Sequence, residues 1–289
     1  DISSYDYDAM LDEAGRPTPK FEAAKALFQK YLPADRFTPL PEPEKALEIK
    51  RFRLTESASL SQILGKPVTA PSPRTLEQMG QPHGMILYRH KAATALSGPL
   101  SFGEVRDYAQ VSVGGVPVGT LDRRNHETAL EVMAKKGAAV DVLVDTMGRI
   151  NYGDQIGKDQ KGLIGEAKLG DETLTGWDHY SLPLEDLDGL KFDTAHIDGP
   201  AFYRGTFETT ETGYTFLDMR GWGKGYVWVN GHNLGRHWSV GPQHALFVPA
   251  PWLKLGTNEV IVLDLHDGAE RTLAGGKNQI WDRPGLVEA

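Results

Sequence analysis

Two carboxylates and two phenols alternate near the start of the chain. Asp6 and Asp8 lie two residues apart, with Tyr5 and Tyr7 between and before them. On a strand, the carboxylates would share one face and the phenols the other. A retaining glycosidase needs two carboxylates about 5–5.5 Å apart, but these flank the sugar and usually come from different strands. We therefore expect Asp6 and Asp8 to bind turn amides or neighbouring charges, although a catalytic pair is the alternative.

Three tyrosines are candidates for ligand binding. If the strand of Tyr5 and Tyr7 belonged to a β/α barrel, its C-terminal end would open on the active face. Phenol rings there stack on sugars, and phenol hydroxyls bind ring oxygens or a catalytic carboxylate. Packing in a core is an equal alternative. Tyr152 lies in MGRINYG (147–153), where it could meet a ligand at a loop tip. The alternative there is a structural loop in which Arg149 binds carbonyl groups.

The remaining motifs predict no metal or cofactor site. His232, His237 and His244 lie close together in sequence, but their spacing matches no metal motif. The glycine-rich GWGKG (221–225) lacks the G-K-[ST] of a phosphate-binding loop, so we expect a turn. Neither G-x-S-x-G nor H-E-x-x-H occurs in the sequence.

The composition is that of an ordinary soluble globular chain. It has 289 residues, of which 40% are hydrophobic and 24% charged. The net charge of -8 and the lack of a basic block argue against a nucleic-acid partner. No apolar run reaches the roughly 18 residues that a membrane span needs. The sequence has no cysteine, which excludes disulfides and thiolate chemistry but does not indicate a compartment.

The elements that would position the first two tyrosines form one β/α unit. Residues 2–7 alternate like a strand, and a helix is expected after Thr18 as its cap and Pro19 as its first residue. One such unit cannot fold alone, because its apolar helix face has no partner. The apolar residues at helical spacing are Phe21, Ala24, Phe28 and Tyr31.

Most of the chain after this unit is predicted to be strand. A proline-rich linker is expected at 33–74, in which the strand-like segment 46–55 could pair into either of two sandwiches. Gly, Asn and Asp turns bound the later strands, which is typical of sandwiches and barrels. The clearest predicted strands are Met85–His90, Ala109–Val113, Val140–Val144, Tyr214–Met219, Tyr226–Val229 and Val260–Leu265.

An internal repeat indicates two copies of one β module. ILYRHKA (86–92) matches AFYRGTF (201–207), and VSVGGVPVG (111–119) matches VWVNGHNLG (227–235), at separations of 115 and 116 residues. KGAAVDVLV (136–144) matches LGTNEVIVL (255–263) more loosely, at a separation near 119. Because the separation far exceeds a solenoid repeat, the copies are whole domains. In each, V-x-V-[GN]-G predicts a strand that enters a tight turn with positive φ.

Long motifs resemble those of family 35 glycoside hydrolases, the β-galactosidases related to lysosomal β-galactosidase. The resemblance begins with SYDYDAMLDEAGRPTPKF, in which Met10 stands where the family has Pro. It continues in family order through nearly the whole chain and is weakest in the linker. The other motifs are MGQPHGMILYRHKA, VSVGGVPVGTLDR, DTMGRINYG and GWGKGYVWVNGHNLGRHWSVGPQHALFVPAPWLKLGTNEV.

The resemblance implies a (β/α)8 barrel followed by two jelly-roll β-sandwiches, with this chain beginning in the last β/α unit. Both catalytic glutamates of the family lie on earlier barrel strands, so the resemblance implies no catalytic residue here. It implies that Tyr5 and Tyr7 line the galactose pocket, and that Tyr152 comes close to it. It implies that Arg149 and Asn151 lie in a loop that we interpret as structural. It favours a periplasmic or secreted location.

We therefore expect a mainly β chain that forms the C-terminal portion of a retaining exo-β-galactosidase. The expected partners are the missing barrel portion and a β-galactoside, with no nucleic acid or membrane. The alternatives are a carbohydrate-binding module, whose exposed platform could be Trp177, Trp222, Trp238 or Trp252, and a purely structural support. The expected divisions are a terminal barrel strand and helix at 1–32, a linker at 33–74, a first sandwich at 75–180 and a second sandwich at 181–289.

Overall fold

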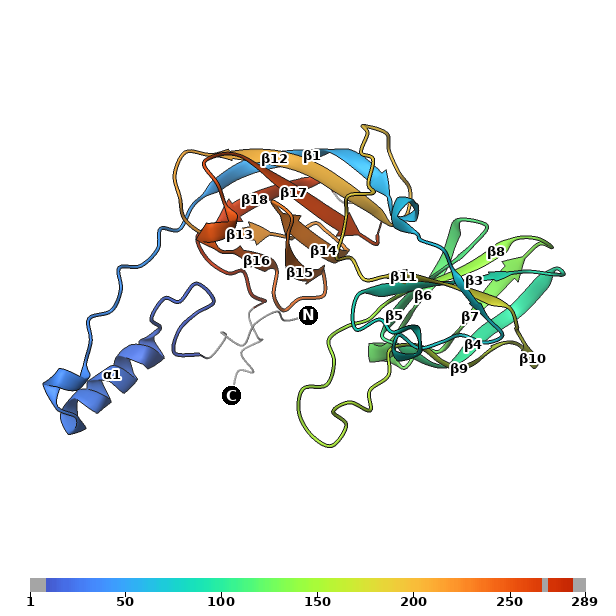
Figure 1. Cartoon of the computed structure of the whole chain (residues 1–289), viewed down its shortest axis with the longest axis horizontal. Helices are drawn as coiled ribbons and strands as arrows, with labels where there is room; N and C mark the ends of the chain where they lie inside the picture. The colour runs from blue at the N-terminus through green and yellow to red at the C-terminus, as the bar shows by residue number, and fades with distance from the viewer. Residues whose placement is uncertain (1–8, 267–269, 283–289) are drawn as a thin grey trace, which may run out of the picture. The chain divides into compact units, whose positions relative to one another are not determined.

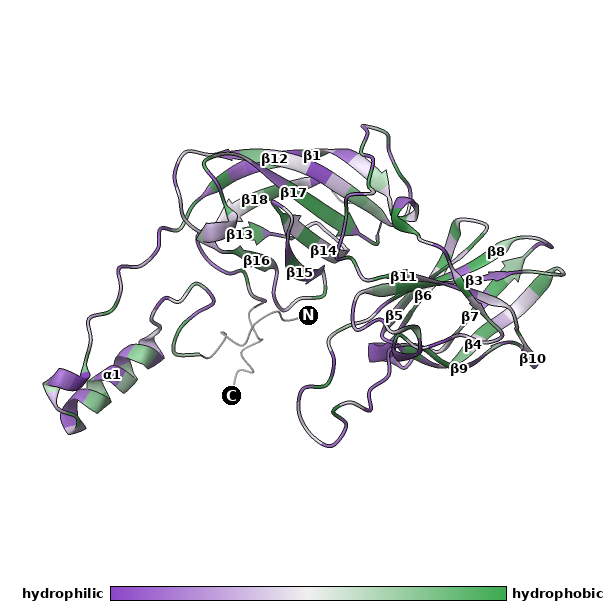
Figure 2. Ribbon diagram, in the orientation of Figure 1, coloured by the Kyte–Doolittle hydropathy of each residue, from purple (hydrophilic) through white to green (hydrophobic). Residues whose placement is uncertain are grey.

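The computed structural model of the chain describes residues 9–266 and 270–282 and is mainly β (Figure 1). It divides into two compact units. One comprises residues 61–190, and the other combines the chain before and after that segment. Figure 2 shows hydrophobic residues concentrated along the strands of both units. Each unit is therefore organised around its own sheets, and we call them the first and the second sandwich.

The first sandwich packs a six-stranded sheet, in the order β2-β11-β3-β8-β5-β6, against a four-stranded sheet, in the order β10-β9-β4-β7. Buried Tyr88, Leu100 and Trp177 are among the residues of the core between them. The strands are β2 Val68–Ala70, β3 Met85–Lys91, β4 Leu96–Arg106, β5 Tyr108–Val113, β6 Val116–Asp122, β7 Ala129–Ala134, β8 Ala139–Asp145, β9 Gly162–Leu169, β10 Glu172–Thr173 and β11 Trp177–Leu182.

The second sandwich is one eight-stranded ladder, β15-β14-β17-β12-β1-β18-β13-β16, that folds over at β1. The first half of β1 pairs with β18, and the second half, from Leu54, pairs with β12. Figure 1 shows β1 lying beside β12. The strands are β1 Ile49–Ser59, β12 Ala201–Thr209, β13 Thr215–Asp218, β14 Lys224–Val229, β15 His232–Trp238, β16 Ala245–Val248, β17 Gly256–Asp264 and β18 Thr272–Gly276.

The two sandwiches contain the same five-strand arrangement, which confirms the internal repeat. The order β11-β3-β8-β5-β6 in the first corresponds to β1-β12-β17-β14-β15 in the second. Both hairpins have a bulge at the same place, after Val111 and after Val227. The third sequence match was wrong by one residue, because Val142, not Leu143, takes the place of Val262. Equivalent rows are Tyr88–Val142–Val111 and Tyr203–Val262–Val227.

Between residue 9 and β1 lie an α-helix, α1 (Pro19–Tyr31), which begins at the predicted proline, and a short 3-10 helix, η2 (Ala34–Arg36). Thr18 is the N-cap residue of α1, as predicted, but its side chain makes no capping hydrogen bond. Thr18 is extended, but its hydroxyl donates to the carbonyls of Ala9 and Met10 instead of accepting from the helix amides. The strand expected at 2–7 lies outside the described residues. The strand-like segment 46–55 corresponds to β1, which joins the second sandwich.

Candidate functional site

The candidate site is the loop of residues 146–161, which joins β8 to β9 in the first sandwich. Its tip presents apolar and aromatic side chains to solvent: Tyr152 is 89% exposed, and Ile150 and Ile156 are also exposed. Isolated exposed apolar residues are common, but three on one loop make this loop a candidate contact surface. An exposed Tyr152 was one of two alternatives for this loop in the sequence analysis. The side chain is exposed in the structure, and its contact with a ligand stays a prediction.

Arg149 anchors the first half of this loop. Its Nε donates to the carbonyl of Pro82 at 3.0 Å, and its Nη1 donates to the carbonyl of Asp159 at 3.2 Å and to Glu77 Oε1 at 2.6 Å. Burial alone would raise the pKa of Glu77, but hydrogen bonds from backbone amides, Arg149 and Thr75 lower it below its ordinary value. The interpretation of Arg149 as a structural residue that binds carbonyls is confirmed.

A buried ionic cluster holds the second half of the loop. Lys161 Nζ lies 2.7 Å from Asp107 Oδ2 and 3.1 Å from Asp159 Oδ2, and all three side chains are buried. Arg106 and Arg123 add ion pairs of 2.6 Å to Asp159 and Asp107, respectively. Burial alone would raise the pKa of Asp159, but the hydrogen bond and charge of Lys161 and the charges of both arginines lower it.

The cluster also ties the loop to its neighbouring strands, because the amide of Met147 donates to Asp107 Oδ2 at 3.0 Å. The exposed tip of the loop is therefore carried on a base that is fixed at both ends. Binding residues are often found on loops that a rigid scaffold positions in this way. Such a loop can hold a phenol and two apolar side chains against a ligand or a neighbouring protein surface.

The other candidate residues belong to other parts of the chain. Tyr5, Tyr7, Asp6 and Asp8 lie outside the described residues. The three histidines of the second sandwich make separate contacts. His232 stacks on Trp252, with ring centroids 4.7 Å apart. His237 forms a hydrogen bond with the carbonyl of Leu263, and His244 pairs with Asp282. Burial lowers the pKa of His237.

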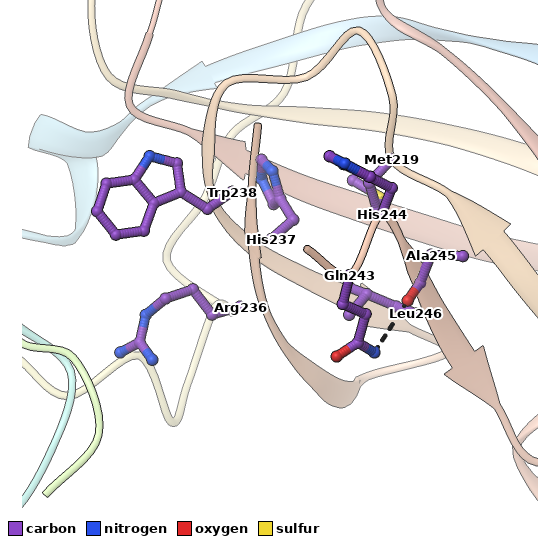
Figure 3. A pocket seen from close by; sticks show the side chains of 8 residues that line it. All are labelled: Met219, Arg236, His237, Trp238, Gln243, His244, Ala245 and Leu246. Atoms are coloured by element: carbon purple, nitrogen blue, oxygen red, sulfur yellow. Dashed lines mark hydrogen bonds between the residues drawn. The ribbon is translucent and has the colours of Figure 1, made fainter. Parts of the chain in front are cut away.

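One cavity of the second sandwich, at the end of β15, is too small for a sugar. Figure 3 shows this cavity, and its volume is about 10 Å³. One water molecule needs about that much space. The cavity is lined by Met219, Arg236, His237, Trp238, Gln243, His244, Ala245 and Leu246.

The tryptophans proposed for a sugar-binding platform are mostly inside the cores. Trp177, Trp222 and Trp238 are buried, and only Trp252 of the four is partly exposed. An open depression of about 430 Å³ lies on the first sandwich beside β9 and β10. No aromatic residue lines this depression, so it offers no ring that could stack on a sugar. The lining residues are Pro, Ser, Thr, Gln, Leu, Ile, Gly and Glu.

Within residues 9–266 and 270–282, no group of three or more His, Asp or Glu side chains is placed to hold a metal ion. In the same part of the chain, no helix has the length and apolar character needed to cross a membrane.

Comparison with known proteins identifies both sandwiches. Residues 73–183 match the family model "Beta-galactosidase, first all-beta domain", and residues 200–258 match "Beta-galactosidase, galactose-binding domain". A β-galactosidase of Xanthomonas manihotis is 43% identical over 248 residues, which cover 85% of this chain and 41% of that protein.

Two mammalian proteins match over a similar range. Human β-galactosidase-1-like protein 2 is 36% identical over 99% of this chain and 46% of its own length. Mouse β-galactosidase is 38% identical over 91% of this chain and 46% of its own length. The chain thus spans less than half the length of the curated relatives that it matches.

Proposed function

Because the chain belongs to the β-galactosidase family, we propose that it is the C-terminal portion of a retaining exo-β-galactosidase of glycoside hydrolase family 35. The complete enzyme would hydrolyse terminal non-reducing β-D-galactose residues through a glycosyl-enzyme intermediate. Its nucleophile and its acid/base would lie in a barrel portion that precedes residue 1 or belongs to a companion chain. The lengths of the relatives support this division, since each is more than twice as long as its match to this chain.

Helix α1 supports the proposal of a missing barrel portion. None of its residues is buried, and its large apolar side chains are exposed to solvent. Leu27 and Phe28 are each 51% exposed, and Tyr31 is 78% exposed. Burying the apolar side chains of a helix is what normally stabilises it in a protein. A helix with this unburied apolar surface is expected to pack on another part of the complete enzyme, as the last helix of a barrel does.

The sandwiches would brace the barrel and form one wall of the active site. The observation that carries this role is the 146–161 loop, which holds an 89% exposed Tyr152 on a base fixed by Arg149 and Lys161. In this proposal Tyr152 contacts the substrate, Tyr7 orients the nucleophile or binds the sugar, and Tyr5 shapes the pocket. No cofactor or metal is required.

Replacement of Tyr152 in the complete enzyme tests this role. Tyr152→Ala should lower kcat/KM for an aryl β-galactoside roughly two- to tenfold, because one lost polar contact to a bound substrate costs about 0.5–1.5 kcal/mol. The melting temperature should stay within a degree, since the side chain is exposed. Met133→Ala removes another exposed apolar side chain, 76% exposed on β7, and should change neither quantity. An unchanged kcat/KM in Tyr152→Ala would contradict the role.

A further inference from the structure

The segment that follows the first eight residues forms a loop closed on itself, which we call the 9–18 loop. Leu11 pairs with Pro17 across the loop, and the amide of Thr18 donates to the carbonyl of Met10 at 3.0 Å. Asp12 organises the turn, because its Oδ1 accepts the amides of Ala14 at 3.0 Å and Arg16 at 2.8 Å. The loop therefore has a defined shape of its own.

Arg16 attaches this loop to the second sandwich. Its guanidinium lies 5.9 Å from the ring centroids of both Tyr214 and Phe216, within the range of a cation–π contact. Its Nη1 donates to the carbonyl of Lys277 and to Asn278 Oδ1, each at 3.0 Å. The arginine thus uses a planar fork and a ring-stacking face together, which lysine cannot reproduce.

Two further contacts come from the same loop. Ala14 packs against the aromatic cluster of Tyr214 and Phe216, and Gln279 Nε2 donates to Glu13 Oε2 at 2.7 Å. The contact therefore extends over Glu13, Ala14 and Arg16.

The segment that receives Arg16 is itself held against the sandwich. The amide of His244 donates to the carbonyl of Ile280 at 2.8 Å, and the amide of Asp282 donates to the carbonyl of Pro242 at 2.7 Å. His244 and Asp282 also form an ion pair of 2.8 Å when the histidine is protonated. Residues 277–282 are therefore fixed, and they offer Arg16 a preorganised set of acceptors.

We propose that the 9–18 loop is the contact through which the second sandwich positions the substrate pocket, with Arg16 as the positioning residue. This proposal rests on the proposed function for one step, the assignment of Tyr5 and Tyr7 to the galactose pocket. The loop begins two residues after Tyr7 in the sequence, so we expect a displaced loop to displace the phenol as well. In a barrel enzyme, the segment after a strand lies at the active-site face.

The second sandwich would then influence catalysis through position alone. Arg16 need not touch the substrate in this role, because it acts through its contacts with the sandwich and with its own loop. Small misplacements of binding groups are known to cost much of the rate. Loss of the contact should therefore change kcat more than it changes the overall stability.

The first test measures the contact itself by hydrogen exchange in the 289-residue chain. Arg16→Met keeps the apolar stem but removes the fork, and it should speed amide exchange of the 9–18 loop about tenfold. Arg16→Lys should have an intermediate effect. Arg51→Met removes an exposed arginine of the same sandwich that bonds Thr272, and it should leave exchange in the loop unchanged. Unchanged exchange of the loop in Arg16→Met would overturn the contact.

A second variant keeps the test valid if Arg16→Met fails to fold. Asn278→Ala removes an exposed acceptor of Arg16 and should speed exchange of the loop less than Arg16→Met does. When Asn278→Ala is combined with Arg16→Met, amide exchange of the loop should be no faster than in Arg16→Met alone, because both changes break the same bond. Additive effects of the two changes would overturn the assignment of this bond.

The second test measures positioning in the complete enzyme. Arg16→Met should lower kcat for an aryl β-galactoside about tenfold with a smaller change in KM, and Arg16→Lys should restore part of the loss. Faster loop exchange with unchanged kcat and KM would overturn the positioning role. A wild-type complete enzyme without β-galactosidase activity would refute the proposed function and this positioning role together. Loop exchange that depends on Arg16 would in that case still support the contact.

Discussion

At the scale of single residues, the base of the 146–161 loop depends on a lysine in the protein interior. Lys161 is 1% exposed and sits between Asp107 and Asp159. Sequence patterns could not predict this cluster. Its members are up to 54 residues apart, and only the register of β4, β5 and β9 brings them together. Arg149 was predictable as a structural residue, because its loop has a recognisable motif.

Lys161→Met should strongly destabilise the first sandwich. Removing one partner of a buried ion pair costs about 3–5 kcal/mol, and the loss here should lie at the lower end of that range because Arg106 and Arg123 still pair with Asp159 and Asp107. Chemical denaturation, followed by the fluorescence of the core residue Trp177, measures the loss. Lys168→Met changes a half-exposed lysine that pairs with exposed Glu166, and it should cost less than about 1 kcal/mol. Equal effects of the two variants would contradict the importance of the cluster.

The lowered pKa of Asp159 predicts a loss of stability in acid. Because the carboxylate is favoured in the folded state, its contribution is complete above the unfolded value of 3.8 and is lost as the pH falls through the lower folded pKa. The free energy of unfolding of the first sandwich should therefore fall below about pH 4. The measurement is denaturation at a series of pH values between 2 and 7. Asp159→Asn should flatten the profile, and a wild-type stability that rises on acidification would refute the assignment.

At the scale of elements, the hairpins were predictable because their turn chemistry is local. Asn230 has φ 49° and Gly231 has φ 84°, as the V-x-V-[GN]-G pattern requires. The equivalent Gly114 and Gly115 of the first sandwich also have positive φ. Non-local details were less predictable, since the sequence alone could not decide which sandwich β1 joins.

Gly231→Val should destabilise the second sandwich by roughly 1–3 kcal/mol, because a β-branched residue resists positive φ. The cost is backbone strain alone, since an added Cβ at this site would meet no atom within 4 Å. Gly65→Val is the matched control, because Gly65 also has open space but no positive φ. Thermal unfolding of both variants measures the difference. A melting temperature within a degree of wild type for Gly231→Val would contradict the strain.

Gly225 shows a different constraint on the same strand pair. A Cβ there would lie 1.9 Å from the carbonyl of Leu263, so Gly225→Ala must displace backbone. The repeat in the sequence located these strands but did not show why residue 225 is glycine. The reason is the close approach of Gly225 to the carbonyl of Leu263, which depends on how β14 and β17 pair. Periodicity thus locates strands, while the packing between them appears only in three dimensions.

At the scale of the whole molecule, we expect residues 1–289 alone not to hydrolyse an aryl β-galactoside faster than buffer. The proposed nucleophile and acid/base lie outside this chain, and a retaining mechanism needs both. Exposed Phe28 and Tyr31 on α1 should also promote self-association or binding to the barrel portion, which light scattering measures. Turnover by the chain that disappears in Asp6→Asn or Asp8→Asn would instead make that aspartate pair catalytic.

The place of β1 in the second sandwich has a consequence for synthesis on the ribosome. Its pairing partners β12 and β18 begin at residues 201 and 272, so the whole first sandwich is translated between β1 and its neighbours. The ends of that inserted unit lie together, since an added Cβ at Gly189 would be 3.9 Å from Ile63. At roughly 5–20 residues per second, β1 waits on the order of ten seconds for β12. The nascent chain must keep this strand unpaired meanwhile, and a chaperone that shields it would favour the correct closure.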